Sequence, residues 1–299
     1  MGNQYIPSVI AVVMLALGLT LTVDDFKRAA TLRRPLAVAL LCQTLLLPSL
    51  CLVIAEAFHL EPHLAVGLML MAATPGGTMA NIVSHLFNGD LALNLTLAAI
   101  NARLSVVALP AILAASMTWF LGAGRFITLQ LDKFVTVFAL VLVPTAIGIA
   151  IRHRFPELAR RMKTPVKIAA VLLLIAAIVG AIAQGETTLM HNFGVVSGAV
   201  VSFCAVSLTV GYLVPRLMRL GPPQAIAISL EIGLHNTVVA LGVALSPQLL
   251  NSVEMATSVA IYGALSPLMA LTFVGAVRAL DPAFRVKAEP EPVASEPGA

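Results

Sequence analysis

Nine apolar stretches follow one another along the chain, each at least roughly 18 residues long, which is enough for a helix to cross a bilayer. They cover residues 6–23, 35–57, 63–87, 91–118, 134–151, 165–184, 193–214, 222–246 and 254–277. Only 11% of the 299 residues are charged and 59% are apolar, whereas soluble domains carry about 25% charged residues. The sequence therefore predicts an all-α integral membrane protein with about nine transmembrane helices in a lipid bilayer.

The positively charged residues are distributed unevenly between the two sides that nine spans define. Fifteen of the 18 Lys and Arg residues lie in or beside the segments on one side. Only Arg125 and Lys133 lie on the other side, and Arg103 falls within the fourth stretch. Because Lys and Arg concentrate in cytoplasmic loops, we expect a multi-pass inner-membrane protein with its N-terminus outside and its C-terminus in the cytoplasm. The net charge of +4 thus reflects topology and does not indicate a nucleic-acid partner.

The third stretch, 63–87, is interrupted near its middle by Pro75, Gly76 and Gly77. Proline removes a backbone donor and clashes with the preceding turn, so we expect two half-helices, with Thr78 as the N-cap of the second. The N–H groups at such a helix start, together with the helix dipole, favour an anion. The alternative is an ordinary proline kink.

The eighth stretch, 222–246, contains Glu231, Gly233, His235 and Asn236 near its middle. An ionisable residue at this depth is expensive and is functional by default, although a structural hydrogen bond of Glu231 is the alternative. Gly233 permits a second break, and Asn236 can cap the half-helix that follows. Two broken spans at matching places predict an inverted repeat, with the breaks crossing at the membrane midplane.

Two motifs at these breaks resemble the bile acid:sodium symporter family. They are the run TPGGTMAN, which ends at Asn81, and the run EIGLHN, which begins at Glu231. The segment GLTLTVDDF from Gly18 and the LLLP segment after Gln43 are also similar to the family. The similarity extends from Tyr5 to about residue 280, and together the motifs are specific.

The resemblance implies a secondary active transporter, not an enzyme, that carries a small organic anion by alternating access. Bile-acid-like, pantothenate-like and keto acids are the implied substrates, and Na⁺ is the implied coupling ion. A single transmembrane domain, 1–287, would consist of a panel (about 1–30 and 125–188) and a core (about 31–124 and 189–280). Residues 288–299, rich in Pro, Glu and Ala, are expected to be a disordered cytoplasmic tail.

The resemblance also implies individual site residues. The second of two sodium sites would use the side chains of Gln43, Glu231 and His235 and the carbonyl groups of Ile232 and Leu234. The first would use Asn81, Asn94 and Glu231. Substrate contacts would come from Thr78, Met79, Asn81 and Asn236. This chain departs from the family at the first site, where Ala80 and Ala98 replace hydroxyl residues, and at His235, which replaces Gln.

Three roles are open for Arg103: a fixed cation that replaces a missing sodium beside Glu231, a partner for the substrate anion, or a structural group that caps loose carbonyls. His235 is either a neutral, hydrogen-bonded residue or a proton-coupling group, since imidazole titrates near neutral pH. We therefore expect sodium coupling with a degraded first site, and coupling to protons or to no ion stays open.

Three other classes of protein are alternatives to a transporter of this family. An intramembrane enzyme would need a paired Asp, a Ser–His pair or a zinc motif, and no such motif is present in the sequence. A cation–proton antiporter of the same architecture would place acidic pairs at the midplane, whereas Glu231 stands alone in its span. A sensor that has lost transport is the third alternative, and uptake into vesicles would separate it from a carrier.

Overall fold

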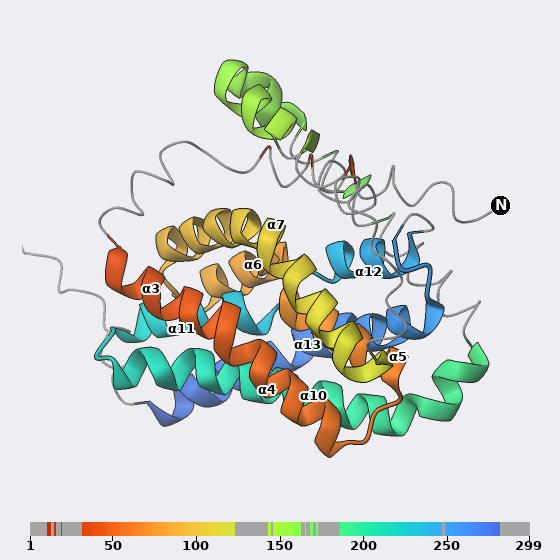
Figure 1. Ribbon diagram of the computed structural model, residues 1–299. Helices are drawn as coiled ribbons and strands as arrows, with labels where there is room; N and C mark the ends of the chain where they lie inside the picture. Colours follow the sequence, from red (N-terminus) through yellow and green to blue (C-terminus); the bar gives the residue numbers. More distant parts are fainter. Residues whose placement is uncertain are drawn as a thin grey trace, which may run out of the picture.

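The computed structural model describes residues 32–122, 146–162, 186–246 and 249–281, together with scattered single residues between 11 and 172. Within these ranges all regular structure is helical (Figure 1), which confirms the all-α expectation for that part of the chain. The elements that build the site are α3 (Arg33–Leu41), the π-helix η2 (Cys42–Leu46), α4 (Leu47–Ala57), α5 (Pro62–Ala73), α6 (Thr78–Leu86), α7 (Leu91–Leu121), α10 (Glu186–Leu217), α11 (Pro222–Gly233), α12 (Thr237–Leu245) and α13 (Val253–Leu280).

Several expectations fall on parts of the chain that the structure does not describe. The predicted spans 6–23, 134–151 and 165–184 lie wholly or largely outside the described residues, and so do the predicted panel ranges. The expected tail, 288–299, lies outside them entirely. The description below therefore concerns the helices of the predicted core.

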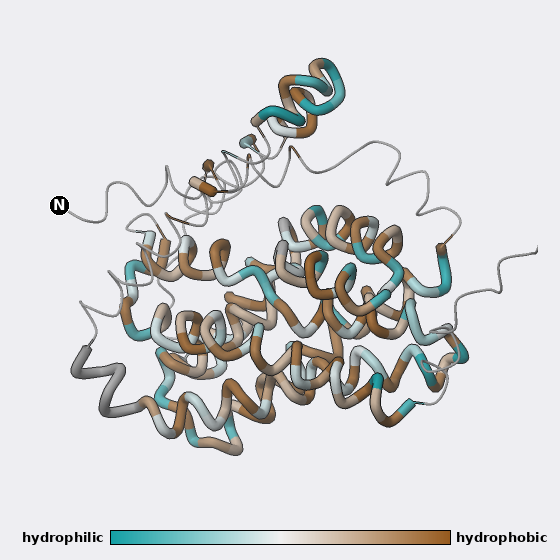
Figure 2. The backbone as a smooth tube through the Cα atoms, turned by 180° about the vertical axis from the view of Figure 1, so that it is seen from behind, coloured by the Kyte–Doolittle hydropathy of each residue, from teal (hydrophilic) through white to brown (hydrophobic). Residues whose placement is uncertain are grey.

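Three described helical segments are long and apolar enough to cross a membrane: Arg33–Ala57, Phe193–Leu217 and Val253–Leu280. Figure 2 shows apolar residues along most of these helices. Helix α7 adds a fourth candidate if its two halves, which meet at 55°, form one span. The bend lies beside Val106, four residues before Pro110, where a proline ring clashes with the carbonyl of the preceding turn. This bend was not among the expectations for the stretch 91–118.

The first expected break separates α5 from α6. Thr74 has an extended backbone (φ −82°, ψ 146°), because a residue that precedes proline is disfavoured in the helical region. Helix α6 then begins at Thr78, and Gly77 is its N-cap. The prediction that Thr78 caps this helix is therefore wrong by one position: extended Gly77 (φ −95°, ψ 174°) already ends the break, so Thr78 is the first helical residue.

The second expected break separates α11 from α12 and consists of Leu234, His235 and Asn236. The side chain of Asn236 accepts a hydrogen bond of 3.2 Å from the Val239 N–H. The prediction that Asn236 caps the second half-helix is therefore confirmed. This capping bond satisfies one of the N–H groups that a helix start leaves without an intrahelical partner.

The two breaks meet and satisfy each other's backbone groups. Gly76 and His235 form an isolated antiparallel bridge. The Gly77 N–H donates to the Leu234 carbonyl and the Asn236 N–H to the Pro75 carbonyl, both at 2.8 Å. In an unbroken helix the Asn236 N–H would have bonded the carbonyl four residues earlier. Because each break supplies hydrogen-bond partners to the other, non-helical backbone is tolerable inside an apolar protein.

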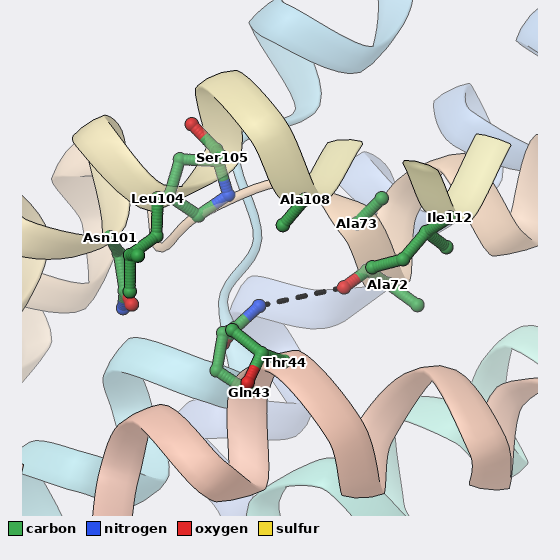
Figure 3. Close-up of a pocket in the computed structure, with 10 residues that line it drawn as sticks. Gln43, Thr44, Ala72, Ala73, Asn101, Leu104, Ser105, Ala108 and Ile112 are labelled. Carbon is green, nitrogen blue, oxygen red and sulfur yellow. Dashed lines mark hydrogen bonds between the residues drawn. The ribbon is translucent and has the colours of Figure 1, made fainter. Parts of the chain in front are cut away.

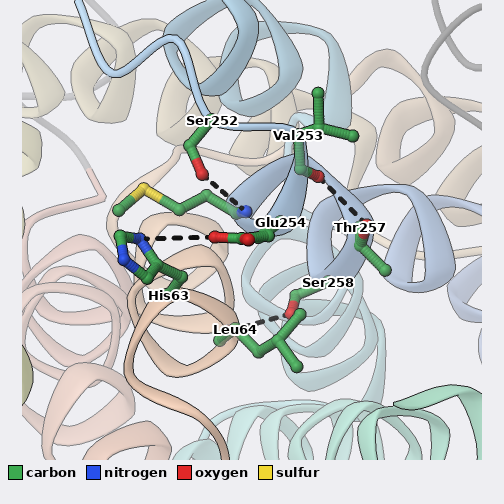
Figure 4. A network of polar contacts seen from close by, with 8 residues as sticks. His63, Leu64, Ser252, Val253, Glu254, Thr257 and Ser258 are labelled. Carbon is green, nitrogen blue, oxygen red and sulfur yellow. Dashed lines mark hydrogen bonds and ion pairs between the residues drawn. The ribbon is translucent and has the colours of Figure 1, made fainter. Parts of the chain in front are cut away.

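The half-helix α5, which leads into the first break, packs closely against α13. A Cβ atom at Gly67 of α5 would overlap the Met255 backbone of α13, so a residue without a side chain lets the two helices approach. Ser258 donates to the Leu64 carbonyl at 2.8 Å across the same interface (Figure 4). At its exposed end, His63 lies 3.8 Å from Glu254. The half-helix α5 is thus held firmly against α13.

Candidate functional site

Glu231 occupies the centre of the candidate site. It lies in the last turn of α11, its side chain is fully buried, and Gly76 of the opposite break lies directly against its carboxylate. Asn101 of α7 donates a hydrogen bond from Nδ2 to Glu231 Oε1 at 3.3 Å. The crossing of the breaks thus encloses an acidic group between two helix ends and α7.

Asn101 is the contact that sequence reasoning did not assign to the site. The signal for it was its helical phase, since Asn101 lies on the same face as Asn94 and Ala98 at i+7 and i+3. Three roles are open for Arg103, two positions later, and only one of them places it beside Glu231. Arg103 is exposed on α7, and the described side-chain hydrogen bond to Glu231 comes from Asn101.

Gln43 projects from the π-helical turn η2 and is 5% exposed. Its Nε2 donates to the Thr74 carbonyl at 3.1 Å and to the Ala72 carbonyl at 3.5 Å. Both acceptors lie at the end of α5, so the amide nitrogen is oriented toward the first break. Short π-helical turns are frequent at functional sites, and here the turn carries Gln43, whose amide contacts the first break.

His235 belongs to the second break and is held by the same carbonyl as Gln43. Its Nδ1 lies 3.0 Å from the Thr74 carbonyl oxygen. A carbonyl oxygen can only accept, so Nδ1 carries the proton in the neutral ring and Nε2 presents a lone pair. The ring stacks on Phe203, with ring centroids 5.6 Å apart and planes at 9°. The centroid of the Tyr262 ring also lies 5.6 Å from that of His235. Two aromatic rings therefore fix the direction of the imidazole.

Tyr262 joins this aromatic group to the end of α11, because its hydroxyl donates to the Gly233 carbonyl at 2.8 Å. The substitution Tyr262→Phe keeps the ring and leaves that buried carbonyl without this donor. We expect the free energy of unfolding to fall by about 1–2 kcal/mol, measured by thermal or denaturant unfolding of the purified protein in detergent. A variant as stable as the parent would contradict this role.

Four buried acceptor atoms of the site have no hydrogen-bond partner among the described residues. They are Gln43 Oε1, Asn101 Oδ1, Glu231 Oε2 and His235 Nε2. Gln43 of η2 and Asn101 of α7 both line one pocket between η2, α5 and α7 (Figure 3). Buried acceptors without donors are costly in an apolar interior. A cluster of them favours a bound cation or another donor.

The structure also brings together Asn81 and Asn94, which the resemblance places at the first sodium site. The two side-chain amides lie 2.9 Å apart. In the orientation that satisfies its surroundings, the Asn94 amide donates to the Ala227 carbonyl at 2.8 Å and accepts from the Asn81 N–H at 3.3 Å. Ala80 and Ala98 beside them are buried and offer no oxygen. The Asn94 amide is therefore occupied with protein partners.

The remaining predicted site residues lie at the two helix starts. Thr78 and Met79 open α6, and Met79 is 42% exposed. Asn236 opens α12 and uses its side chain as the cap. Two carbonyl groups were also predicted as ligands. The Leu234 carbonyl accepts a hydrogen bond from the Gly77 N–H. The helical partner of the Ile232 carbonyl would be the Asn236 N–H, which donates to the Pro75 carbonyl instead.

Comparison with known proteins gives concordant results. Residues 7–192 match the sodium bile acid symporter family. The sodium-dependent transporter YocS of Bacillus subtilis is 24% identical over 245 residues, 82% of this chain and 74% of that protein. A chloroplast sodium/metabolite cotransporter of Arabidopsis thaliana is 28% identical over 243 residues, 80% of this chain and 58% of that protein. The human ileal sodium/bile acid cotransporter is 26% identical over 231 residues, 76% of this chain and 65% of that protein.

The chain therefore aligns over most of its own length, but it spans less than two thirds of the plant and human relatives. The family match alone covers more than half of the chain. The two motifs that first suggested a family, at Thr74 and Glu231, form the crossing of the breaks in the structure. This multi-pass membrane protein belongs to the sodium bile acid symporter family, whose members are transporters and not enzymes.

Proposed function

We propose that the chain is a secondary active transporter that moves a small organic anion across the membrane by alternating access, driven by sodium. The relatives support this proposal, since the Bacillus protein is named as a sodium-dependent transporter and the human protein as a sodium/bile acid cotransporter. Bile-acid-like, pantothenate-like and keto acids are the substrates that we would test. The membrane that we infer is the inner membrane of a bacterial cell.

The architecture that we infer has nine spans, an inverted repeat, an outside N-terminus and a cytoplasmic C-terminus. Residues 1–30 and 125–188 would form the panel, and 31–124 and 189–280 the core. The antiparallel meeting of the α5–α6 and α11–α12 breaks supports a repeat of opposite orientation. In such transporters the site lies where the broken helices cross, and the two domains move against each other around it.

The observation that carries the proposal is the burial of Glu231 among acceptor atoms. A buried carboxylate without a cationic partner is expensive, and oxygen atoms are the ligands that hard cations prefer. A sodium ion taken up from solution would neutralise the charge of the carboxylate and would be coordinated by the acceptor atoms that have no hydrogen-bond donor. Besides Glu231, the proposed ligands at this side of the crossing are the side chains of Gln43 and His235 and the carbonyls of Ile232 and Leu234.

The anionic group of the substrate is proposed to bind at the starts of α6 and α12. Both helices begin at the crossing, and a helix start offers backbone N–H groups and the positive end of its dipole. Thr78 and Met79 at α6 and Asn236 at α12 are the proposed contacts, with Asn81 one turn further along α6. Arg103 is a proposed second source of positive charge for the anion, because guanidinium groups match carboxylates geometrically.

Uptake into proteoliposomes tests the proposal. Purified protein would be reconstituted and offered radiolabelled taurocholate, pantothenate or pyruvate under an inward sodium gradient, with choline replacing sodium as the control. We expect uptake of at least one anion above protein-free liposomes, reduced at least about tenfold in choline because the ion supplies the driving force. Uptake that is equal in both cations would contradict sodium coupling, and no uptake of any organic anion would contradict transport.

Proton coupling is the second candidate, and the geometry of His235 is the observation that favours it. The lone pair on Nε2 is buried and has no donor among the described residues, so it can accept a proton. The same liposomes with an inward proton gradient in sodium-free buffer separate the two candidates. Uptake that rises with the proton gradient and ignores sodium would assign the coupling to His235.

A further inference from the structure

We propose that this chain binds one coupling cation in a composite site to which Asn101 of α7 contributes an oxygen beside Gln43 and Glu231, in place of the ligands that Ala80 and Ala98 cannot supply. The role of this cation in transport rests on the proposed function. The site itself stands on the positions of three buried side chains, and it can be tested without a substrate.

The first argument is the placement of the two amides. Asn101 is 2% exposed and Gln43 is 5% exposed, yet both line the pocket between α7 and η2 (Figure 3). Thr44 and Ser105 line this pocket too. Two buried amides on the lining of one pocket can contribute ligands for a small polar guest.

The second argument is the direction in which each amide is held. The Nε2 of Gln43 donates to carbonyls at the end of α5, and the Nδ2 of Asn101 donates to Glu231 Oε1. Each amide nitrogen is therefore occupied, and each amide oxygen has no hydrogen-bond partner in the described part of the protein. Glu231 Oε2 has none either. Two oxygens on the pocket lining, and one on the carboxylate that is hydrogen-bonded to Asn101, therefore stand without a donor.

The third argument is the state of the rival site. In the orientation that satisfies its surroundings, the Asn94 side chain donates to the Ala227 carbonyl and accepts from the Asn81 backbone N–H. A cation on that side of Glu231 would have to break these bonds and would find no oxygen on Ala80 or Ala98. On the α7–η2 side, binding would satisfy acceptors that have no donor now. The balance of polar contacts therefore favours the side on which Asn101 lies.

The charge of the site selects the class of cation. The proposed ligands carry one negative charge, on Glu231, and the two amides are neutral. Among the described residues, no group of three or more His, Cys, Asp and Glu side chains is placed to hold a metal ion. A monovalent hard cation such as Na⁺ balances this charge, whereas a divalent ion would leave a buried net charge.

Sodium titration of the purified full-length protein tests the site. The melting temperature would be followed against NaCl, with choline chloride keeping the ionic strength constant and with no organic anion present. A ligand that binds only the folded state raises the melting temperature with its concentration. We expect saturable stabilisation with a Hill coefficient near one, as a single site requires. A coefficient approaching two would show a second ion and overturn the proposal.

Three variants identify the ligand. Asn101→Leu removes the oxygen and fills the space, and we expect it to raise the sodium midpoint on the order of tenfold or more. Asn101→Asp keeps an oxygen at this position, and its midpoint is expected to stay within about threefold of the parent or to fall, because it adds charge. Asn94→Ala, at another buried Asn of α7, tests the rival site, and the composite site predicts that it raises the midpoint by less than Asn101→Leu does.

The outcomes separate the alternatives. If Asn94→Ala raises the midpoint and Asn101→Leu does not, the ion lies on the Asn81 side and the composite site is wrong. If Asn101→Asp behaves like Asn101→Leu, Asn101 acts only as a donor to Glu231 and is not a ligand. If Asn101→Leu does not fold, the Hill coefficient of the parent protein and the sodium midpoint of Asn101→Asp still test the composite site. Sodium binding as expected, but with no uptake of any anion, would contradict the proposed transport while the site stands.

Discussion

Glu231→Gln is expected to abolish the response to sodium while the protein still folds. In proteoliposomes, sodium-driven uptake should fall at least about 100-fold, because a cation that loses its buried carboxylate partner loses on the order of 3–5 kcal/mol. The melting temperature should no longer rise with sodium. Glutamine has nearly the shape of glutamate, so the packing around the crossing is retained.

The same variant should be at least as stable as the parent in choline. Without the ion, Glu231 is a carboxylate with no exposed surface, and its described hydrogen-bond donor is the Asn101 amide. Removing a desolvated charge of this kind is neutral or stabilising. Opposite effects in the two buffers, stabilisation in choline and loss of the sodium response, would distinguish an ion ligand from a structural hydrogen-bonding group.

Glu254→Gln provides the matched control. Glu254 opens α13, its side chain is 51% exposed, and its partner is the half-exposed His63 at 3.8 Å. Exposed ion pairs contribute between about 0 and 1 kcal/mol, so uptake and sodium response should stay within about twofold of the parent. A Glu231→Gln variant that still binds sodium and transports like this control would exclude Glu231 as the ion ligand.

The two breaks were predictable because their causes are local. Pro75 forces an extended conformation on the residue before it, and Asn236 is a strong helix N-cap. The burial of Glu231 also follows from its position in an apolar stretch of 25 residues, 222–246. Composition alone indicated a helical membrane protein, because a chain with 11% charged residues cannot cover a soluble surface.

The contacts that complete the site were not predictable in this way. Asn101 and Glu231 are 130 positions apart: helical phase places Asn101 on the face of Asn94 and Ala98, but only the meeting of the breaks brings Glu231 to that face. The π-helical turn that carries Gln43 depends on packing between α3–α4 and α5 and leaves no local signal in CQTLL. The panel and the count of nine spans concern residues largely outside those that the structure describes.

Gly76→Ala is expected to destabilise the crossing and to abolish transport. A Cβ atom at this position would overlap the carboxylate of Glu231. To make room, either the buried Glu231 carboxylate must leave its position and its bond to Asn101, or the first break must move away from the second and weaken the two backbone bonds of 2.8 Å that join them. Overpacking of this kind costs about 1–3 kcal/mol, which should appear as a lower free energy of unfolding and as uptake near background.

Gly275→Ala is the control for a glycine inside the membrane. A Cβ atom at Gly275 of α13 has open space around it, and alanine is the better helix former by about 1 kcal/mol. Its stability should therefore equal or exceed that of the parent, with unchanged uptake. If Gly76→Ala were equally harmless, the close approach of Gly76 to Glu231 would not be what holds the crossing together.

A second substitution can show that the harm in Gly76→Ala comes from contact with Glu231 and not from the backbone of the break. Glu231→Asp shortens the acidic side chain by one methylene and retracts the carboxylate from position 76. The double variant should be more stable than the sum of the single effects predicts, by about 0.5–3 kcal/mol, the range found for residues in contact. Additive effects would mean that the added methyl group strains the Pro75–Gly77 turn itself, and that the crossing depends on the turn more than on the acid that it surrounds.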